Sequence, residues 1–268
     1  MTTRAVILAR GLGRRMRESD SDAPLAREQA AAADTGLKGM IPIGRPFLDY
    51  VLSALADAGF TEACLVIGPE HQQIRDHYDQ LAPTRISIAY AEQSLPLGTA
   101  DAVLAAEAFA GDHPFVVINS DNYYPPAALQ ELQGLEEPAI VAFEQEALVR
   151  EGNAPRERVS RFGALEVGAD GYLIRIVGDP ERARASTGGK IYASMNCWLF
   201  TKEIFQACRD VAPSPRGELE LTRAAQLAID AQTLRFRVLF SRRPVLDLSS
   251  RADIVKVAER LSVAKVRL

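Results

Sequence analysis

Short apolar runs alternate with amphipathic segments over the first 120 residues of the chain. Runs too short for helices predict buried strands at residues 4–9, 63–68, 85–92 and 114–120. Apolar residues at helical spacing predict helices between them, at residues 46–60, 70–81 and 99–111. Continuously apolar strands that are separated by helices are typical of a parallel sheet covered on both faces.

The pattern changes after about residue 140. Residues 161–177 predict two strands joined by a glycine-containing turn, which is an antiparallel element. Further strands are predicted at 192–200, 234–241 and 244–248, and helices at 201–211, 218–230 and from Arg251 onward. Residues 18–36 and 179–190 are expected to be loops, the first with a short mobile helix. We therefore expect an α/β fold, a three-layer α/β/α sandwich with a mixed, mostly parallel, Rossmann-like sheet and a small antiparallel element in the second half.

The amino-acid composition argues against several classes of protein. The 268 residues are 47% hydrophobic, enough for a full core, and the net charge of −4 argues against a general nucleic-acid binder. No apolar run approaches the roughly 20 residues that span a bilayer, so no membrane partner is expected. Three cysteines in apolar contexts, without a C-x-x-C pair or an apparent signal peptide, predict a reduced, cytoplasmic protein.

Basic charge is concentrated in "VILARGLGRRMR", residues 6–17, where a strand runs into a turn with Gly11 and Gly13. Such a turn lets backbone N–H groups and cations converge on an anion. The segment is not a phosphate loop of the G-K-[ST] type, and Met16 stands where a dinucleotide fingerprint has its third glycine. The pattern favours phosphate binding; a solvated glycine turn is the alternative.

Three further charged residues stand out. Lys38 is the single lysine among the first 189 residues, whereas Asp121 and Asp247 each follow or end an apolar strand. Two carboxylates at strand ends can chelate one Mg²⁺, which usually takes one or two carboxylates plus substrate oxygens. Capping of the following turns is the alternative role for both.

Six segments in order resemble the sugar-1-phosphate nucleotidylyltransferases, also called NDP-sugar pyrophosphorylases. "LARGLGRRM" is similar to the family's L-A-x-G-x-G-T-R-M, and "LKGMIPIGRPF" to its K-x-x-x-P-I segment. "EQSLPLGTADAV", "FVVINSDNYY", "SPRGELELTRAAQLAI" and "VLDLSSRADI" are similar to its later motifs. The resemblance covers nearly the whole chain and implies the nucleotide-diphospho-sugar transferase fold.

The resemblance implies attack by a sugar-1-phosphate oxygen on the α-phosphorus of a nucleoside triphosphate, with release of pyrophosphate. It assigns Arg15 to the β- and γ-phosphates, Lys38 to the α-phosphate, and Asp121 and Asp247 to Mg²⁺. Such a reaction between anions depends on positioning and charge neutralisation. The expected catalytic residues are therefore Arg15, Lys38 and Asp121.

Two sets of binding residues are expected. The resemblance assigns Gln93 to the base and Gly163 to the sugar, whereas Lys190 is included as a cation that is near in sequence and Arg14 as an added positive charge at the turn. The nucleotide-binding set is Leu8, Ala9, Gly11, Gly13, Arg14, Gln93, Gly98 and Thr99. The acceptor-binding set is Asn122, Gly163, Lys190, Asn196 and Glu218.

The chain departs from the family at the turn and at the acceptor. Arg10 replaces a small residue and Arg14 a threonine. Each arginine adds positive charge for phosphate binding, or, as the alternative for Arg10, its side chain crowds the nucleotide. Asp179 stands where the family lysine holds the sugar phosphate, which leaves Lys190, Arg182 and Arg184 as replacements. An unusual sugar, a cyclitol or another polyol phosphate is therefore an open alternative for the acceptor.

We expect one nucleotidyltransferase domain over residues 1–268, with a nucleotide-binding half (1–140) and an acceptor-binding half (141–268). The expected partners are small-molecule substrates, and a homo-oligomer is left open. Two other functions stay open: a cytidylyltransferase acting on a non-sugar phosphate such as phosphocholine, and a catalytically silent, nucleotide-sensing homologue. A dehydrogenase is disfavoured because the third glycine is missing.

Overall fold

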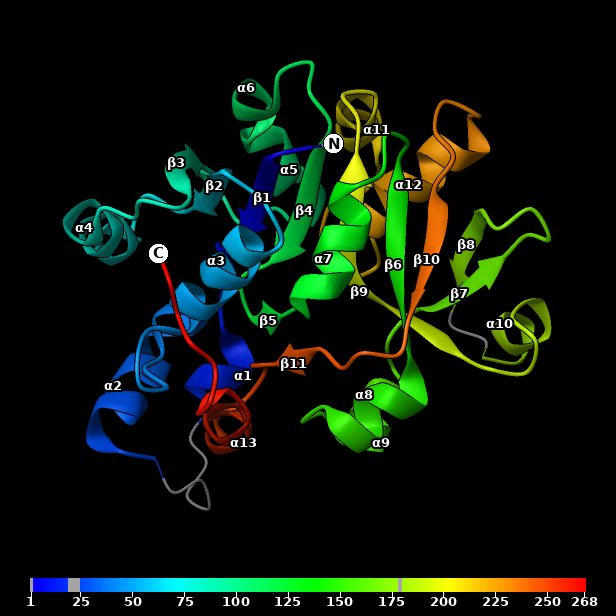
Figure 1. The fold of residues 1–268 in the computed structure, drawn as a ribbon. Coiled ribbons are helices and arrows are strands. Elements are labelled where there is room, and N and C mark those ends of the chain that lie inside the picture. The colour runs from blue at the N-terminus through cyan, green and yellow to red at the C-terminus, as the bar shows by residue number, and fades with distance from the viewer. Residues whose placement is uncertain (1, 19–24, 178–179) are drawn as a thin grey trace.

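A nine-stranded mixed sheet forms the centre of the molecule (Figure 1). The computed structural model describes residues 2–18, 25–177 and 180–268. The strands are β1 (Arg4–Leu8), β2 (Glu62–Ile67), β3 (Ser87–Glu92), β4 (Phe115–Asn119), β5 (Asn122–Tyr123), β6 (Ala139–Glu144), β7 (Ala164–Val167), β8 (Leu173–Val177), β9 (Tyr192–Phe200), β10 (Arg237–Ser241) and β11 (Leu246–Asp247). The two shortest, β5 and β11, form a separate antiparallel pair.

The main sheet has the order β10-β6-β9-β4-β1-β2-β3. β1, β2, β3 and β4 are parallel to one another, and β10 is parallel to β6. β9 runs antiparallel between β4 and β6, and β7 pairs with β8 and β9 at one side. The expected mixed, mostly parallel sheet with a small antiparallel element is confirmed.

Helices cover both faces of this sheet. Their bounds are α1 (Arg14–Arg17), α2 (Arg27–Thr35), the 3₁₀ turn η1 (Lys38–Met40), α3 (Phe47–Asp57), α4 (Gln72–Leu81), α5 (Thr99–Ala105), α6 (Glu107–Ala110), α7 (Pro126–Gln133), α8 (Gln145–Glu151), α9 (Arg156–Val159), α10 (Pro180–Ser186), α11 (Ile204–Asp210), α12 (Leu221–Asp230) and α13 (Arg251–Leu261). α3, α4 and α7 pack on one face, and α5, α11 and α12 on the other.

Two buried cores result from the alternation of side chains along each strand. In β1, Ala5 and Ile7 join the core under α3 and α7, whereas Val6 and Leu8 join the core under α5 and α12. Successive strand residues point to opposite faces, so a strand with helices on both sides must be apolar throughout. The three-layer arrangement follows from that pattern.

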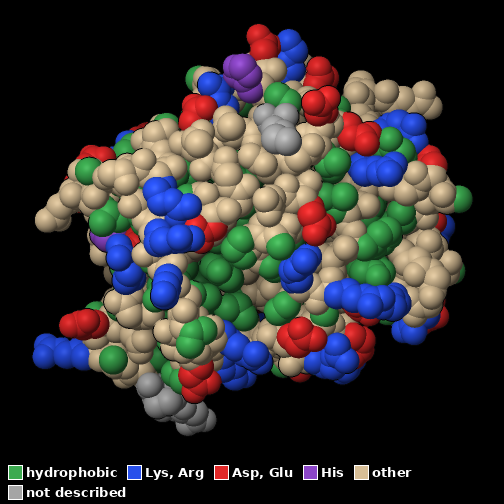
Figure 2. Space-filling model, in the orientation of Figure 1, with side chains coloured by type: hydrophobic (Ala, Val, Ile, Leu, Met, Phe, Trp, Pro, Cys, Tyr) green, Lys and Arg blue, Asp and Glu red, His purple; other side chains and the backbone are tan. Residues whose placement is uncertain are grey.

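The C-terminal residues add a further layer outside α3. The segment after α13 runs back along α3 (Figure 1), and the backbone N–H of Arg267 donates to the Ser53 hydroxyl at 3.0 Å. This explains why residues 47–55 are all buried. Figure 2 shows the face over α3 and α7, which carries exposed side chains of both charge signs.

Several sequence-based boundaries need correction. Residues 179–190 were expected to be a loop, but residues 180–186 form α10. The helix expected at 99–111 is two helices, α5 and α6, which meet at Ala106. β6, α7, α8 and α9 were not predicted, and β11 leaves the main sheet to pair with β5. Within the described residues, no helix is both long and apolar enough to cross a membrane.

Candidate active site

Predicted site residues follow three of four neighbouring parallel strands, at their carboxyl ends. In the order β4-β1-β2-β3, Asp121 comes two residues after β4, the glycine turn follows β1, and Gln93 follows β3. The backbone N–H groups of Ala9 and Gln93 each donate to β2 carbonyls at 2.9 Å, which aligns these three strand ends. Parallel α/β sheets bind ligands at this edge.

The glycine turn after β1 is shaped by a close contact with the segment that precedes Lys38. Gly13 has φ +58°, and a Cβ there would lie 2.2 Å from the carbonyl oxygen of Gly36. The turn therefore requires glycine at this position and lies against residues 36–38. At Gly11, a Cβ would meet nothing within 4 Å, so its backbone faces open space.

The arginines around this turn differ in their partners. Arg17 donates to a backbone carbonyl at the end of α2 at 2.7 Å. The side chain of Arg10 is only 7% exposed, and its Nη2 lies 3.2 Å from Glu70 beside the loop after β2. Arg14 and Arg15 are exposed, and neither forms an ion pair with a described residue. Two cations of the cluster therefore remain available to an anion.

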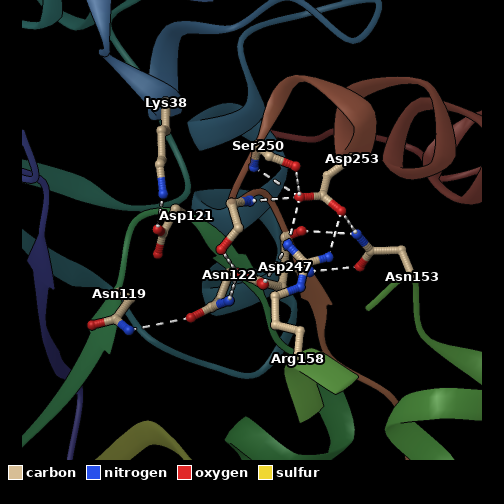
Figure 3. Close-up of polar contacts among 10 residues, drawn as sticks. Lys38, Asn119, Asp121, Asn122, Asn153, Arg158, Asp247, Ser250 and Asp253 are labelled. Atoms are coloured by element: carbon tan, nitrogen blue, oxygen red, sulfur yellow. Dashed lines mark hydrogen bonds and ion pairs between the residues drawn. The ribbon is translucent and has the colours of Figure 1, made fainter. Parts of the chain in front are cut away.

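Lys38 and Asp121 form an ion pair at the edge of the sheet. The Nζ of Lys38 lies 2.8 Å from Oδ2 of Asp121, and the two side chains are 14% and 27% exposed. Figure 3 shows the lysine pointing from η1 toward the carboxylate after β4. Two residues that are 83 positions apart in the chain thus meet at this edge of the sheet.

Asp247 is buried beside this pair, on β11 opposite Asn122. Its Oδ1 accepts hydrogen bonds from Asn122 Nδ2 and Ser249 Oγ, both at 3.2 Å. Its Oδ2 is buried and accepts no hydrogen bond from a described residue. Burial and then the negative charge of Asp121 raise the pKa of Asp247 to about 6, against the opposing charge of Arg158.

The two carboxylates are of the chemical kind that holds a divalent metal. The described residues contain no group of three or more His, Cys, Asp or Glu side chains arranged to hold an ion. Mg²⁺ is usually held by one or two carboxylates and completes its shell with water and phosphate oxygens. The Oδ2 of Asp247 accepts no hydrogen bond from a described residue, although Arg158 Nη1 lies 3.5 Å away, and the Asp247 and Asp121 carboxylates together offer oxygen donors of that kind.

Gln93 has a fixed amide orientation. Its Nε2 donates to the carbonyl oxygen of Gly98 at 3.0 Å and to the Asp101 carboxylate at 2.7 Å. Both partners are acceptors, so the nitrogen of the amide must face them. The Oε1 atom of Gln93 receives no hydrogen bond from a described residue and is the atom left for a ligand.

Gly98 and Thr99 have structural partners in the loop before α12. Gly98 has φ +133°, and a Cβ there would lie 2.4 Å from the carbonyl oxygen of Leu219. The hydroxyl of Thr99 accepts a hydrogen bond from the backbone N–H of Leu221 at 2.8 Å. Packing against residues 219–221 therefore requires both residue types, independently of their predicted contacts with the nucleotide.

The predicted acceptor residues are only partly brought together. Gly163 and Lys190 lie near the start of β9: the Gly163 carbonyl accepts from β9, and Lys190 Nζ lies 2.9 Å from Glu144. Asn196, at φ +53°, lies within β9. Glu218 is an exposed loop residue next to the segment that contacts Gly98, rather than at the start of a helix.

Asn122 is buried behind Asp247 rather than exposed toward a ligand. Its Oδ1 accepts hydrogen bonds from Asn119 at 3.2 Å and from the Tyr124 hydroxyl at 3.3 Å, while its Nδ2 donates to Asp247. These contacts use the side chain to hold Asp247. Its assignment to the acceptor stays a prediction.

Asp179, the most serious departure from the family pattern, lies outside the described residues. The basic residues considered as replacements for the family lysine are all ion-paired: Lys190 with Glu144, Arg182 with Glu166 at 4.0 Å, and Arg184 with Glu181 at 3.7 Å. None of them is therefore preformed as an unpaired phosphate ligand.

Sequence reasoning missed the residues that surround Asp247. Two of them come from the segment between β6 and β7: Asn153 contacts Asp247 across 94 residues, and Arg158 contacts Asp253 across 95. No local pattern signals such pairs. The S-x-x-D spacing of Ser250 and Asp253, a capping-box arrangement at the start of α13, could have identified Asp253.

The fold is that of the UDP-glucose pyrophosphorylases. A solved structure of UDP-glucose pyrophosphorylase complexed with UDP-glucose superposes with a TM-score of 0.72 at 18% identity, and the match covers 99% of this chain and 100% of that chain. At this identity the likeness defines the fold alone.

Sequence comparison defines the family. Residues 4–260 match the family model described as nucleotidyl transferase, and the chain belongs to this family, with the sugar-1-phosphate nucleotidylyltransferases. A glucose-1-phosphate thymidylyltransferase of Streptomyces antibioticus is 32% identical over 85% of this chain. The UTP–glucose-1-phosphate uridylyltransferase AglF of Haloferax volcanii is 30% identical over 84% of this chain and 83% of its own length.

The first of these relatives is longer than this chain: the match spans 57% of its length. Enzymes of the family generally use a divalent metal.

Proposed function

We propose that this protein transfers a nucleotidyl group from a nucleoside triphosphate to a sugar-1-phosphate, with Mg²⁺ as the metal. An oxygen of the acceptor phosphate attacks the α-phosphorus, the bond from the α-phosphorus to the bridging oxygen breaks, and pyrophosphate leaves. The products are an NDP-sugar and pyrophosphate. The observation that carries this proposal is the Lys38–Asp121 ion pair together with the buried Asp247 carboxylate, one oxygen of which accepts no hydrogen bond from a described residue.

The cations of the site would neutralise charge at both ends of the bond that breaks. Lys38, held at Asp121, would contact the α-phosphate, where negative charge builds in the transition state. Arg15, exposed and without an ion pair to a described residue, would bind the β- and γ-phosphates and the departing pyrophosphate. The backbone at Gly11 has open space for a phosphate to approach.

Asp121 and Asp247 would hold Mg²⁺ together with phosphate oxygens. The metal would neutralise charge on the triphosphate and orient it. Asp247 must be ionised to bind Mg²⁺, and Asp121 would contact both Mg²⁺ and Lys38.

The base is proposed to be uracil or thymine. Because Gln93 presents its Oε1, it accepts a hydrogen bond and favours a base that carries a ring N–H at that edge. Uracil, thymine and guanine have such a group, whereas cytosine and adenine present a lone pair there. The names of the thymidylyl and uridylyl relatives favour the two pyrimidines over guanine.

The acceptor is proposed to be a hexose-1-phosphate, as the names of the relatives suggest. The same names, together with Gln93, speak against a cytidylyltransferase acting on phosphocholine. We also propose that residues 1–140 bind the nucleotide and residues 141–268 the acceptor within one domain. β9, from the second half, lies between β4 and β6 in one continuous sheet, which supports a single unit.

A pyrophosphate-release assay tests the proposal. Five NTPs are combined with glucose-1-phosphate, other sugar-1-phosphates, cyclitol phosphates and phosphocholine, each with and without Mg²⁺. We expect release with UTP or dTTP and a sugar-1-phosphate, only when Mg²⁺ is present. Release with CTP and phosphocholine would support the alternative enzyme, and nucleotide binding without release for any pair would indicate a silent homologue.

A further inference from the structure

Asn153 holds the backbone of Asp247 with a two-way amide contact. Its Oδ1 accepts from the backbone N–H of Asp247 at 2.7 Å, and its Nδ2 donates to the backbone carbonyl of Asp247 at 2.8 Å. The N–H and C=O of one strand residue point to the same side, so a single amide side chain can satisfy both. β11 pairs with β5 on its other side, so Asn153 takes the place of a neighbouring strand.

Arg158, on α9, approaches the carboxylate of Asp247. Its two terminal nitrogens donate to the Asp253 carboxylate at 2.7 and 2.6 Å, and Nη1 lies 3.5 Å from Oδ2 of Asp247. Asp253 is fixed in turn by the backbone N–H of Ser250 at 2.8 Å. Figure 3 shows this arrangement. The guanidinium therefore faces Asp247 but is held back from a hydrogen bond with it.

We propose that residues 145–159, the support segment, set the position of the metal ligand Asp247. Asn153 is a positioning residue that fixes the Asp247 backbone. Arg158 is a second positioning residue: Asp253 binds its guanidinium, so Arg158 compensates the charge of Asp247 from 3.5 Å without forming a hydrogen bond to Oδ2. This inference rests on the proposed metal-dependent function and names residues that act on its metal site without contacting the substrate.

The affinity for Mg²⁺ is the quantity that this arrangement controls. Removing the Asn153 amide leaves the Asp247 backbone without its partners, so the carboxylate is held in a less defined position. Loss of a residue that orients a metal ligand typically weakens metal binding by about 10- to 100-fold. Binding of the free nucleotide should change little, because no described contact links Asn153 to the glycine turn or to Gln93.

The test uses the full chain with Asn153→Ala and the matched control Arg150→Ala. Arg150 lies on the same segment, is 69% exposed, and pairs only with Glu151 among the described residues. Mg²⁺ affinity is measured by calorimetry in the presence of α,β-methylene UTP, and nucleotide affinity is measured without metal. We expect about 10-fold or greater weakening of Mg²⁺ binding in Asn153→Ala, nucleotide binding within about twofold, and recovery of turnover at high Mg²⁺.

A second variant, Arg158→Lys, covers the case in which Asn153→Ala does not fold. A flexible ammonium can leave Asp253 and reach Oδ2 of Asp247, where it competes with the metal. Mg²⁺ affinity should therefore fall at least fivefold, with recovery of turnover at high Mg²⁺. Wild-type Mg²⁺ affinity in Asn153→Ala, or in Arg158→Lys if the first variant is unfolded, overturns the inference but leaves the proposed function intact. A wild-type protein that releases pyrophosphate without Mg²⁺ overturns the proposed metal dependence instead.

Discussion

The two charged regions of the candidate site are built in opposite ways. The side chain of Asp247 is buried and accepts hydrogen bonds from Asn122 and Ser249, and its backbone is hydrogen-bonded to Asn153. In the glycine turn, Arg14 and Arg15 are exposed and have no ion pair with a described residue. The first region is organised in the absence of a substrate, whereas we expect the second to be organised by the phosphates that we propose it binds.

This difference predicts how each region responds to change. Preorganised groups in a region shielded from water act strongly on a transition state, because they need not reorient during the reaction. Interactions between exposed cations and an anion are screened by salt, so each such cation contributes less to binding and catalysis. Substitutions in the buried region should therefore lower the activity strongly and independently of salt. Substitutions in the turn should lower it less, by an amount that depends on the salt concentration.

The largest effect is expected at the Lys38–Asp121 pair. Lys38→Ala or Asp121→Ala should lower kcat by about a thousandfold, because each removes charge stabilisation where the reaction occurs. Lys202→Ala, which removes an exposed lysine paired with Asp112, serves as the control. Turnover is measured by pyrophosphate release, and the melting temperature reports the fold. Near-wild-type turnover in a folded variant of either residue would remove the proposed mechanism.

Arg15→Ala should lower kcat/KM for the triphosphate by about 100-fold at low salt. Raising the ionic strength should weaken triphosphate binding more in the wild type than in this variant, because the variant has lost one screened contact. Arg161→Ala, at an arginine that is 73% exposed and paired with Glu157, is the matched control. Equal salt dependence of wild type and Arg15→Ala would show that the arginine does not bind the phosphates.

The pH dependence of metal binding should report Asp247. With a pKa of about 6, its carboxylate is protonated in acid, so Mg²⁺ affinity should fall about tenfold for each pH unit below 6. Calorimetric titration with Mg²⁺ between pH 5 and pH 8 measures this. An affinity that stays constant down to pH 5 would contradict the raised pKa.

The same pKa affects the stability of the metal-free protein. An unfolded aspartate has a pKa of about 3.9, so between about pH 4 and pH 6 the folded state binds more protons than the unfolded state. The free energy of unfolding should therefore decrease as pH rises through this range, by at most about 3 kcal/mol from this group. Asp247→Asn should remove this contribution, as urea unfolding at pH 4.5 and pH 7 would show.

The smallest effect separates the two glycines of the turn. Gly13→Ala should cost about 1–3 kcal/mol of stability, because its φ is positive and its Cβ would overlap Gly36. Gly11→Ala should leave stability nearly unchanged but weaken triphosphate binding, because the methyl group would project into open space. Denaturant unfolding and nucleotide titration of the two variants check this pair, and equal destabilisation would contradict it.

Much of the fold could be predicted because its pattern is local. β1, β2 and β4 are apolar at every buried position, and a parallel sheet between two helical layers demands that pattern. β6 has the same apolar pattern but lies where the sequence rhythm changes, and it was missed. α8 and α9 are short, at seven and four residues, and carry too little periodicity to be detected.

The amino-acid sequence by itself determined the chemistry available at the site: a glycine turn with arginines, one early lysine, and acids at strand ends. These features depend on residue types at short spacing. Only the tertiary structure decided which groups meet, because packing brings together residues far apart in the chain. In the folded protein, Arg10 forms an ion pair with Glu70, and Asp101 fixes the orientation of the Gln93 amide. Asn153 contacts the backbone of Asp247, 94 residues away.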